Sequence, residues 1–102
     1  MGIVLEVVLL YIPDLVEVDQ LEKFAELLAG VDKDVPVMLL AFFPEFKLLY
    51  LRSPTLDEMV AGYMVLKKRL NKVRVGNVGV FCKTTDCINR LIELIGREAV
   101  AL

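Results

Sequence analysis

Residues 3–12 read Ile-Val-Leu-Glu-Val-Val-Leu-Leu-Tyr-Ile and contain one charged residue, Glu6. Such a nearly continuous apolar run is typical of a strand that is buried on both faces, whereas a half-exposed strand alternates apolar and polar residues. Pro13 and Asp14 end the run. The stretch therefore predicts a strand that is covered on both faces.

A helical pattern follows this strand, and a second strand follows the helix. Asp19 is placed as an N-cap with Glu22 at the third helical position, and Gly30 supplies a stop. Residues 35–42 (Val-Pro-Val-Met-Leu-Leu-Ala-Phe) predict the second strand. Pro36 is tolerated there because it lies at the strand's beginning.

The same alternation continues to the end of the chain. A second capping box at residues 55–58 opens a helix that Asn71 closes. The third strand begins at residues 72–75, and the glycines of residues 76–79 predict a turn or a close approach of the backbone. Thr84 or Thr85 can cap a third helix, which ends at Gly96, and the tail, residues 97–102, is expected to fray.

These elements predict an α/β fold of three β-α units with a parallel sheet, in one domain spanning residues 1–102. Helical connections between neighbouring strands are expected to make right-handed crossovers. A closed TIM barrel takes eight β-α units and about 250 residues, so three units would supply only part of one, about three eighths. We expect both outer strands to need cover from other polypeptide.

Composition excludes several classes of function. The net charge of −2 disfavours nucleic-acid binding, and the absence of histidine removes Ser-His, Cys-His and His-metal chemistry. Apolar residues make up 57% of the chain, above the roughly 45–50% of ordinary domains. The longest uncharged run, residues 35–44, is too short for a membrane span of about 20 residues. We therefore expect a cytoplasmic chain without membrane partners that buries its apolar surplus against another polypeptide, and the charge composition fits heat adaptation.

The carboxyl ends of the three strands meet at one edge, where ligand sites of α/β proteins gather. Asp14 and Glu45 could pair as acid and base there, although such acids more often cap helices or face solvent. Lys47 could bind an anionic ligand or lie over Phe46. Asn77, between glycines, could bind a ligand through its amide, but a turn-forming role is favoured because Asn tolerates left-handed backbone.

Cys82 and Cys87 are separated by four residues, unlike the Cys-x-x-Cys spacing of redox dithiols or zinc knuckles. Two thiols are too few for a zinc or iron-sulfur site. Two reduced, partly buried thiols are favoured over a disulfide, which intracellular proteins of hyperthermophiles do contain. A thiol enzyme using Cys82 or Cys87 is a third functional hypothesis.

The order of short motifs over residues 4–80 resembles the C-terminal part of radical S-adenosylmethionine enzymes, in the pyruvate formate-lyase-activating-enzyme-like group. The motifs that carry the resemblance are Tyr11-Ile12-Pro13-Asp14, Asp32-Lys33-Asp34-Val35-Pro36, Ala41-Phe42-Phe43-Pro44-Glu45-Phe46-Lys47, Ser53-Pro54-Thr55-Leu56-Asp57-Glu58 and Val75-Gly76-Asn77-Val78. The resemblance implies that Ile12, Pro13 and Asn77 lie at the cofactor and that Lys47 contacts substrate.

The departures from this family concern its chemistry. The Cys-x-x-x-Cys-x-x-Cys motif that binds the [4Fe-4S] cluster has no counterpart, and the family's Arg and His on the middle strand correspond to Ala41 and Phe43. We therefore expect no cofactor in this chain, with the cluster and S-adenosylmethionine implied only for a full-length parent, and no catalysis or metal site in the chain alone. The partner is then the missing N-terminal part of the barrel. The alternative is a stand-alone interaction module that homodimerises through its open sheet edge.

Overall fold

The computed structural model describes residues 6–13, 16–42 and 53–101. Its sheet has the order β1-β2-β3, and both pairs of neighbours are parallel. The elements are β1 (Val7–Tyr11), α1 (Val18–Val31), β2 (Val37–Ala41), α2 (Leu56–Lys67), β3 (Val73–Gly76), α3 (Val78–Phe81), α4 (Thr85–Ile95) and the 3₁₀ helix η1 (Arg97–Ala99). The predicted α/β class with three parallel strands is confirmed, and the sheet does not close into a barrel.

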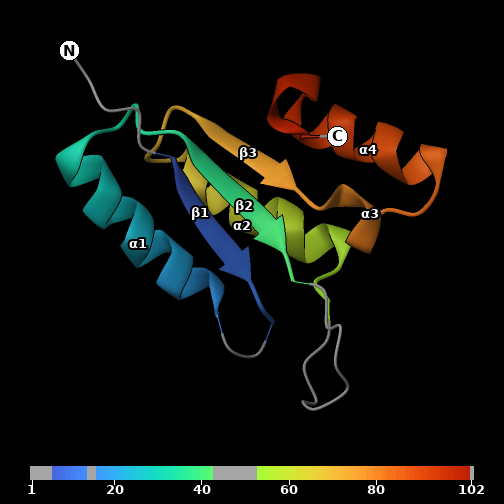
Figure 1. Ribbon diagram of the computed structural model, residues 1–102, viewed down its shortest axis with the longest axis horizontal. Helices are drawn as coiled ribbons and strands as arrows, with labels where there is room; N and C mark the ends of the chain where they lie inside the picture. The colour runs from blue at the N-terminus through green and yellow to red at the C-terminus, as the bar shows by residue number, and fades with distance from the viewer. Residues whose placement is uncertain (1–5, 14–15, 43–52, 102) are drawn as a thin grey trace.

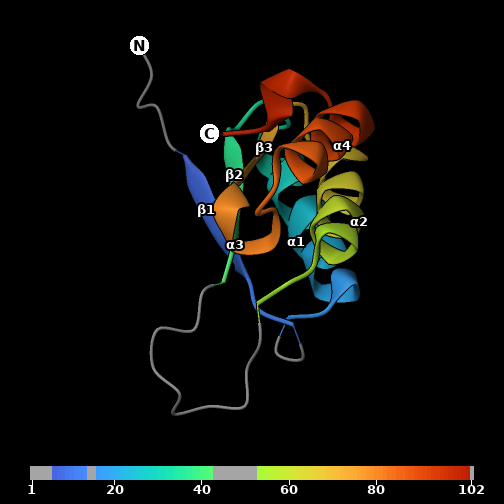
Figure 2. The same ribbon diagram turned by 90° about the vertical axis from the view of Figure 1, so that its right-hand side faces the viewer.

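The long helices α1, α2 and α4 lie on one side of the sheet (Figures 1 and 2). Successive right-handed crossovers between adjacent strands, all progressing in one direction, place every connecting helix on the same face. Leu39, Val75 and Ala25 are completely buried between the two layers. Within the described residues, β1 is therefore covered on one face only, and not on both faces as its apolar run predicts.

The N-cap of helix α1 lies two residues before the predicted cap, and the helix ends one residue after the predicted stop. Glu17 precedes its first turn, and the Glu17 backbone N–H donates to Gln20 Oε1 at 2.8 Å. Gln20 thereby satisfies the backbone N–H of the cap residue itself. Gly30 stays helical, and the Asp32 N–H closes the helix on the Leu28 carbonyl.

The start of α2 follows the sequence prediction. The Glu58 N–H donates to Thr55 Oγ1 at 3.3 Å, and the Thr55 N–H donates to Glu58 Oε1 at 2.9 Å, which completes the capping box. Met59 and Tyr63 are buried on the side of α2 that faces the sheet.

The C-terminal segment differs from the expected fraying tail. After Gly96, residues 97–99 form η1, and Ala99 and Val100 are each only 6% exposed. Val100 forms a parallel bridge with Val75, and the Ala101 N–H donates to the Val75 carbonyl at 2.9 Å. Burial of two apolar side chains and this backbone hydrogen bond hold the segment against the outer edge of β3.

Candidate functional site

The parallel register brings the ends of the three strands to one edge, as expected. Tyr11 is paired with Ala41, and Leu40 with Gly76, so Ile12 and Phe42 follow at the same level of the sheet and Asn77 comes next to Ala41. Ile12 is half-buried and Pro13 is buried. Lys47, Glu45 and Asp14 lie outside the described residues.

Asn77 has a left-handed backbone, with φ 56° and ψ 41°. Its side-chain amide Nδ2 donates to the Ala41 carbonyl at 3.1 Å and so joins the end of β3 to the end of β2. This geometry supports the turn-forming interpretation, because the backbone conformation and the amide both serve the link between strands. The cofactor-binding roles of Ile12, Pro13 and Asn77 stay predictions.

Gly76 shows the close approach that its sequence context predicts. A Cβ at this position would lie 2.5 Å from Leu40 Cδ2 and 3.0 Å from Met38 Sδ. The side chains of β2 therefore fill the space beside the last residue of β3, where the chain turns into α3.

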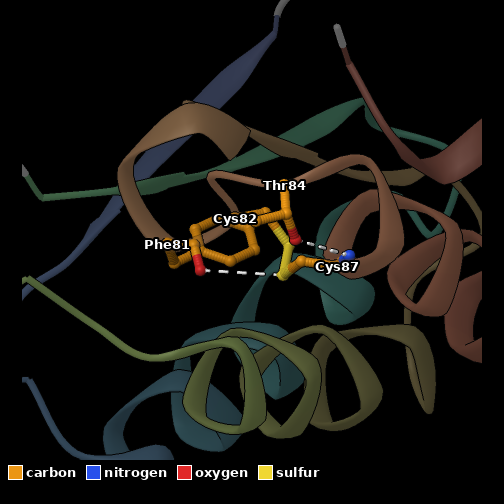
Figure 3. Close-up of a disulfide and its surroundings, with 4 residues drawn as sticks. All are labelled: Phe81, Cys82, Thr84 and Cys87. Carbon is orange, nitrogen blue, oxygen red and sulfur yellow. Dashed lines mark hydrogen bonds between the residues drawn. A yellow bond between two sulfur atoms is a disulfide. The ribbon is translucent and has the colours of Figure 1, made fainter.

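The two cysteines form a disulfide, and the prediction of two reduced thiols was wrong (Figure 3). The chain reverses between α3, which ends next to Cys82, and α4, whose N-cap Thr84 accepts the Cys87 N–H at 3.1 Å. This reversal places the two Cα atoms 5.3 Å apart, within the usual range for a bridge. Cys87 Sγ also lies 3.8 Å from the Phe81 carbonyl oxygen, to which only a reduced thiol could donate a proton.

The residues present do not fit an iron-sulfur cluster. Such a cluster needs several free thiolates, and here the sulfurs of Cys82 and Cys87 are bonded to each other. In the described part of the chain, no group of three or more His, Cys, Asp or Glu side chains is placed to hold a metal ion.

An apolar surface covers the side of the sheet away from the helices. Val8 is 56% exposed and Leu10 is 44% exposed, and their β2 neighbours Met38 and Leu40 are half-buried. We call these four residues the bare face. Val7 and Leu9, which alternate with them along β1, pack against the core instead.

The outer edge of β1 has unpaired backbone groups. The Val7 N–H donates to the Pro36 carbonyl and the Phe42 N–H donates to the Tyr11 carbonyl, so the odd-numbered residues of β1 bond to β2. Since a parallel ladder alternates along the strand, the N–H and C=O groups of Val8 and Leu10 point away from β2. No described residue pairs with this edge.

Helix α1 continues this open edge with an apolar stripe. Phe24, Leu27 and Val31 are 36%, 69% and 85% exposed, and their spacing places them on one side of the helix. We call them the α1 flank. The opposite side of α1 faces α2, where Arg69 Nη2 lies 2.9 Å from Glu26 Oε1. Figure 1 shows α1 beside β1, at the end of the molecule away from α4.

The structure also contains a cavity that the sequence patterns do not indicate. It has a volume of about 800 Å³ and lies at the amino end of the sheet, between the start of β3, the end of α2 and the segment after α4. Its lining combines residues that are distant in sequence, such as Lys67 and Arg97, and they share no motif. The site residues predicted from the sequence belong to the opposite, carboxyl edge.

No helix among the described residues is long and apolar enough to cross a membrane. Comparison of the chain with family models, with curated proteins and with solved structures finds no match in any of the three. The assignment of function therefore rests on the geometry described above and on the motif order of the sequence.

Proposed function

We propose that this chain is the C-terminal β-α part of a radical S-adenosylmethionine barrel of the pyruvate formate-lyase-activating-enzyme-like group, acting in the cytoplasm. It shapes the barrel wall and performs no radical chemistry alone. The order of motifs from Tyr11 to Val78 supports the group. The disulfide and the lack of a fit for the cluster support the absence of catalysis in this chain.

The bare face is the observation that carries this proposal. In a TIM barrel every helix lies outside the sheet and the inner face is packed with branched apolar side chains. Here the three long helices share one side of the sheet, and Val8, Leu10, Met38 and Leu40 occupy the other. Further β-α units placed beyond β1 would cover this face and pair the β1 edge.

Calorimetric titration tests the absence of cofactor binding. We expect S-adenosylmethionine to give no saturable heat with the 102-residue chain, because Asn77 uses its amide on Ala41 and no cluster is available to anchor the ligand. A micromolar isotherm would contradict the proposal. A Cys-x-x-x-Cys-x-x-Cys motif in a reading frame continuous with Met1 would identify the rest of the barrel.

A stand-alone interaction module is the second candidate, and the α1 flank favours it. Two copies related by a twofold axis could pair their β1 edges antiparallel and bring their α1 flanks together in the helical layer. Val8 and Leu10 would then exchange backbone hydrogen bonds with Leu10 and Val8 of the second copy. No residue from Val7 to Tyr11 is charged, so like-charge repulsion along the β1 edge would not oppose the contact.

Light scattering after size exclusion distinguishes the two candidates. Both predict that the isolated chain associates, and a monomer at high concentration would contradict both. Leu27→Lys places a charge on the α1 flank and leaves the bare face intact. We expect Leu27→Lys to dissociate an edge-paired dimer. Association through the bare face would instead persist in Leu27→Lys and be lost in the double variant that combines Val8→Lys with Leu10→Lys. Met64→Lys, an exposed apolar position on α2, is the matched control.

A further inference from the structure

We propose that the cavity at the amino end of the sheet binds a small organic dianion with an apolar body, for which a phosphate monoester is a suitable probe. The cavity is remote from the carboxyl edge, and of the four residues of the bare face only Met38 lines it. The inference goes beyond the proposed function, because it concerns the binding of a small anion and not association through the bare face.

The charge of the lining selects an anion. Four cationic side chains line the cavity together with two carboxylates, Glu6 and Glu98, so the lining has a net charge of +2 in a chain whose net charge is −2. The cations are Lys67, Lys72, Arg74 and Arg97. Among the described residues none of these four forms an ion pair, in contrast to Arg69, which binds Glu26. A phosphate monoester carries between about −1.5 and −2 charges at neutral pH, which matches this excess.

One of these cations is held in place by the protein. Lys67 Nζ donates to the Asn71 carbonyl oxygen at the end of the turn after α2. Asn71 is itself fixed, since its Nδ2 donates to Asp34 Oδ1 at 2.7 Å and its N–H donates to the Lys33 carbonyl. The Lys67 ammonium keeps two further protons for a ligand.

Tyr63 gives the cavity an unused polar group. It is 94% buried at 6% exposure, lines the cavity from α2, and its hydroxyl makes no hydrogen bond within the described structure. No buried and unsatisfied side-chain oxygen exists among the described residues, so this hydroxyl reaches the open space of the cavity. Burial raises the pKa of the Tyr63 hydroxyl, so it keeps its proton at neutral pH and can donate to an anionic oxygen.

The remaining walls suit an apolar body. Val37, Val73, Ile95 and Ala99 contribute aliphatic side chains, and the volume of about 800 Å³ lies within the range of small-molecule sites. Inorganic phosphate would use only the cations, whereas an aromatic ester would also bury its ring. The cavity should therefore favour phenyl phosphate over phosphate.

Titration of the full 102-residue chain with phenyl phosphate, inorganic phosphate and phenol, followed by amide NMR, tests the proposal. We expect saturable binding of phenyl phosphate at one site per chain, at least tenfold weaker binding of phosphate and none of phenol. The shifted amides should be those of residues 72–74 and 96–99. Absence of saturation at millimolar phenyl phosphate, or shifts centred on Ile12 and Asn77, would overturn the proposal.

Three substitutions test the roles of the lining residues. Tyr63→Phe keeps the ring and should weaken phenyl phosphate binding about 2- to 10-fold, the range for one hydrogen bond. Lys72 is exposed, and Lys72→Gln should weaken phenyl phosphate binding more than threefold. Lys68→Gln makes the same charge change outside the cavity and should leave this binding unchanged. Equal losses in Lys72→Gln and Lys68→Gln would show a general electrostatic effect and overturn the site. Should Tyr63→Phe unfold by circular dichroism, the two lysine variants still decide the question.

Discussion

Gly62 and Gly30 both lie within helices, but the space around their Cα atoms differs. A Cβ at Gly62 of α2 would lie 2.9 Å from Tyr11 Cε2 and 3.1 Å from Leu39 Cδ2, so the helix approaches β1 and β2 closely there. A Cβ at Gly30 of α1 would have no neighbour within 4 Å. The sequence shows two helical glycines and does not distinguish them, because the difference arises only from packing.

This contrast predicts opposite effects of the same substitution. Gly30→Ala should stabilise the protein by about 0.5–1 kcal/mol, because alanine has the higher helix propensity and meets no obstacle. Gly62→Ala gains the same propensity but pushes against a rigid tyrosine ring, and overpacking costs about 1–3 kcal/mol. Urea unfolding of the two variants measures both changes, and stabilisation by Gly62→Ala would contradict the packing described.

Two variants of Asn77 separate the free-energy cost of its left-handed backbone from the contribution of its side-chain hydrogen bond. Asn77→Ala should lower the free energy of unfolding by about 1.5–3 kcal/mol, since it loses the hydrogen bond to Ala41 and keeps a left-handed residue with a Cβ. Asn77→Gly loses only the hydrogen bond and should cost less than about 1.5 kcal/mol. Equal losses in the two variants, measured by urea unfolding, would contradict a left-handed conformation at this position.

At the scale of elements, features that depend on hydrogen bonds between residues close in sequence were predicted better than features that depend on long-range contacts. The capping box at Thr55 and Glu58 was predicted correctly, and Thr84 is one of the two caps predicted for α4, because these hydrogen bonds span three residues. The start of α1 was wrong because Glu17 with Gln20 is a less common cap than Asp19 with Glu22. The position of the C-terminal segment beside β3 could not be predicted, since residues 97–101 have no strand pattern and depend on Val75.

The disulfide was missed for a related reason. A spacing of four residues between cysteines does not show whether the intervening residues bring them together. Here they do, because the chain reverses at residues 83–84 and enters the first turn of α4, which holds Cys87. The candidate site shows the same limit, because the edge holding Ile12 and Asn77 was predictable from topology and the cavity lining was not.

Reduction of the disulfide should destabilise the junction between α3 and α4. A bridge that closes so short a loop contributes about 2 kcal/mol in the chain-entropy treatment, so a reducing agent should lower the free energy of unfolding by about that amount. Urea unfolding with and without reductant measures the effect. Cys82→Ala combined with Cys87→Ala is the control and should not respond to reductant. Two thiols that react in the unreduced native protein would contradict the bridge.

At the scale of the whole molecule, the uneven cover of the sheet predicts uneven hydrogen exchange. β2 is paired on both sides, whereas the amides of Val8 and Leu10 point to the open edge of β1. We expect these two amides to exchange fast in dilute protein and to gain protection as the concentration rises, while the amide of Leu39 stays protected throughout. Exchange that does not depend on concentration would contradict association through this edge.

The segment beside β3 makes the two borders of the sheet unequal. The Ala101 N–H donates to the Val75 carbonyl there, and η1 lies next to it, so the described structure covers part of the β3 border and leaves the β1 border open. Growth of a fibre by strand addition requires two accepting borders on every copy. Two copies that join through their open β1 borders use up both, and a third copy meets only the partly covered β3 borders. Self-assembly of this molecule through strand addition is therefore expected to halt at a pair, without the endless stacking that leads to amyloid.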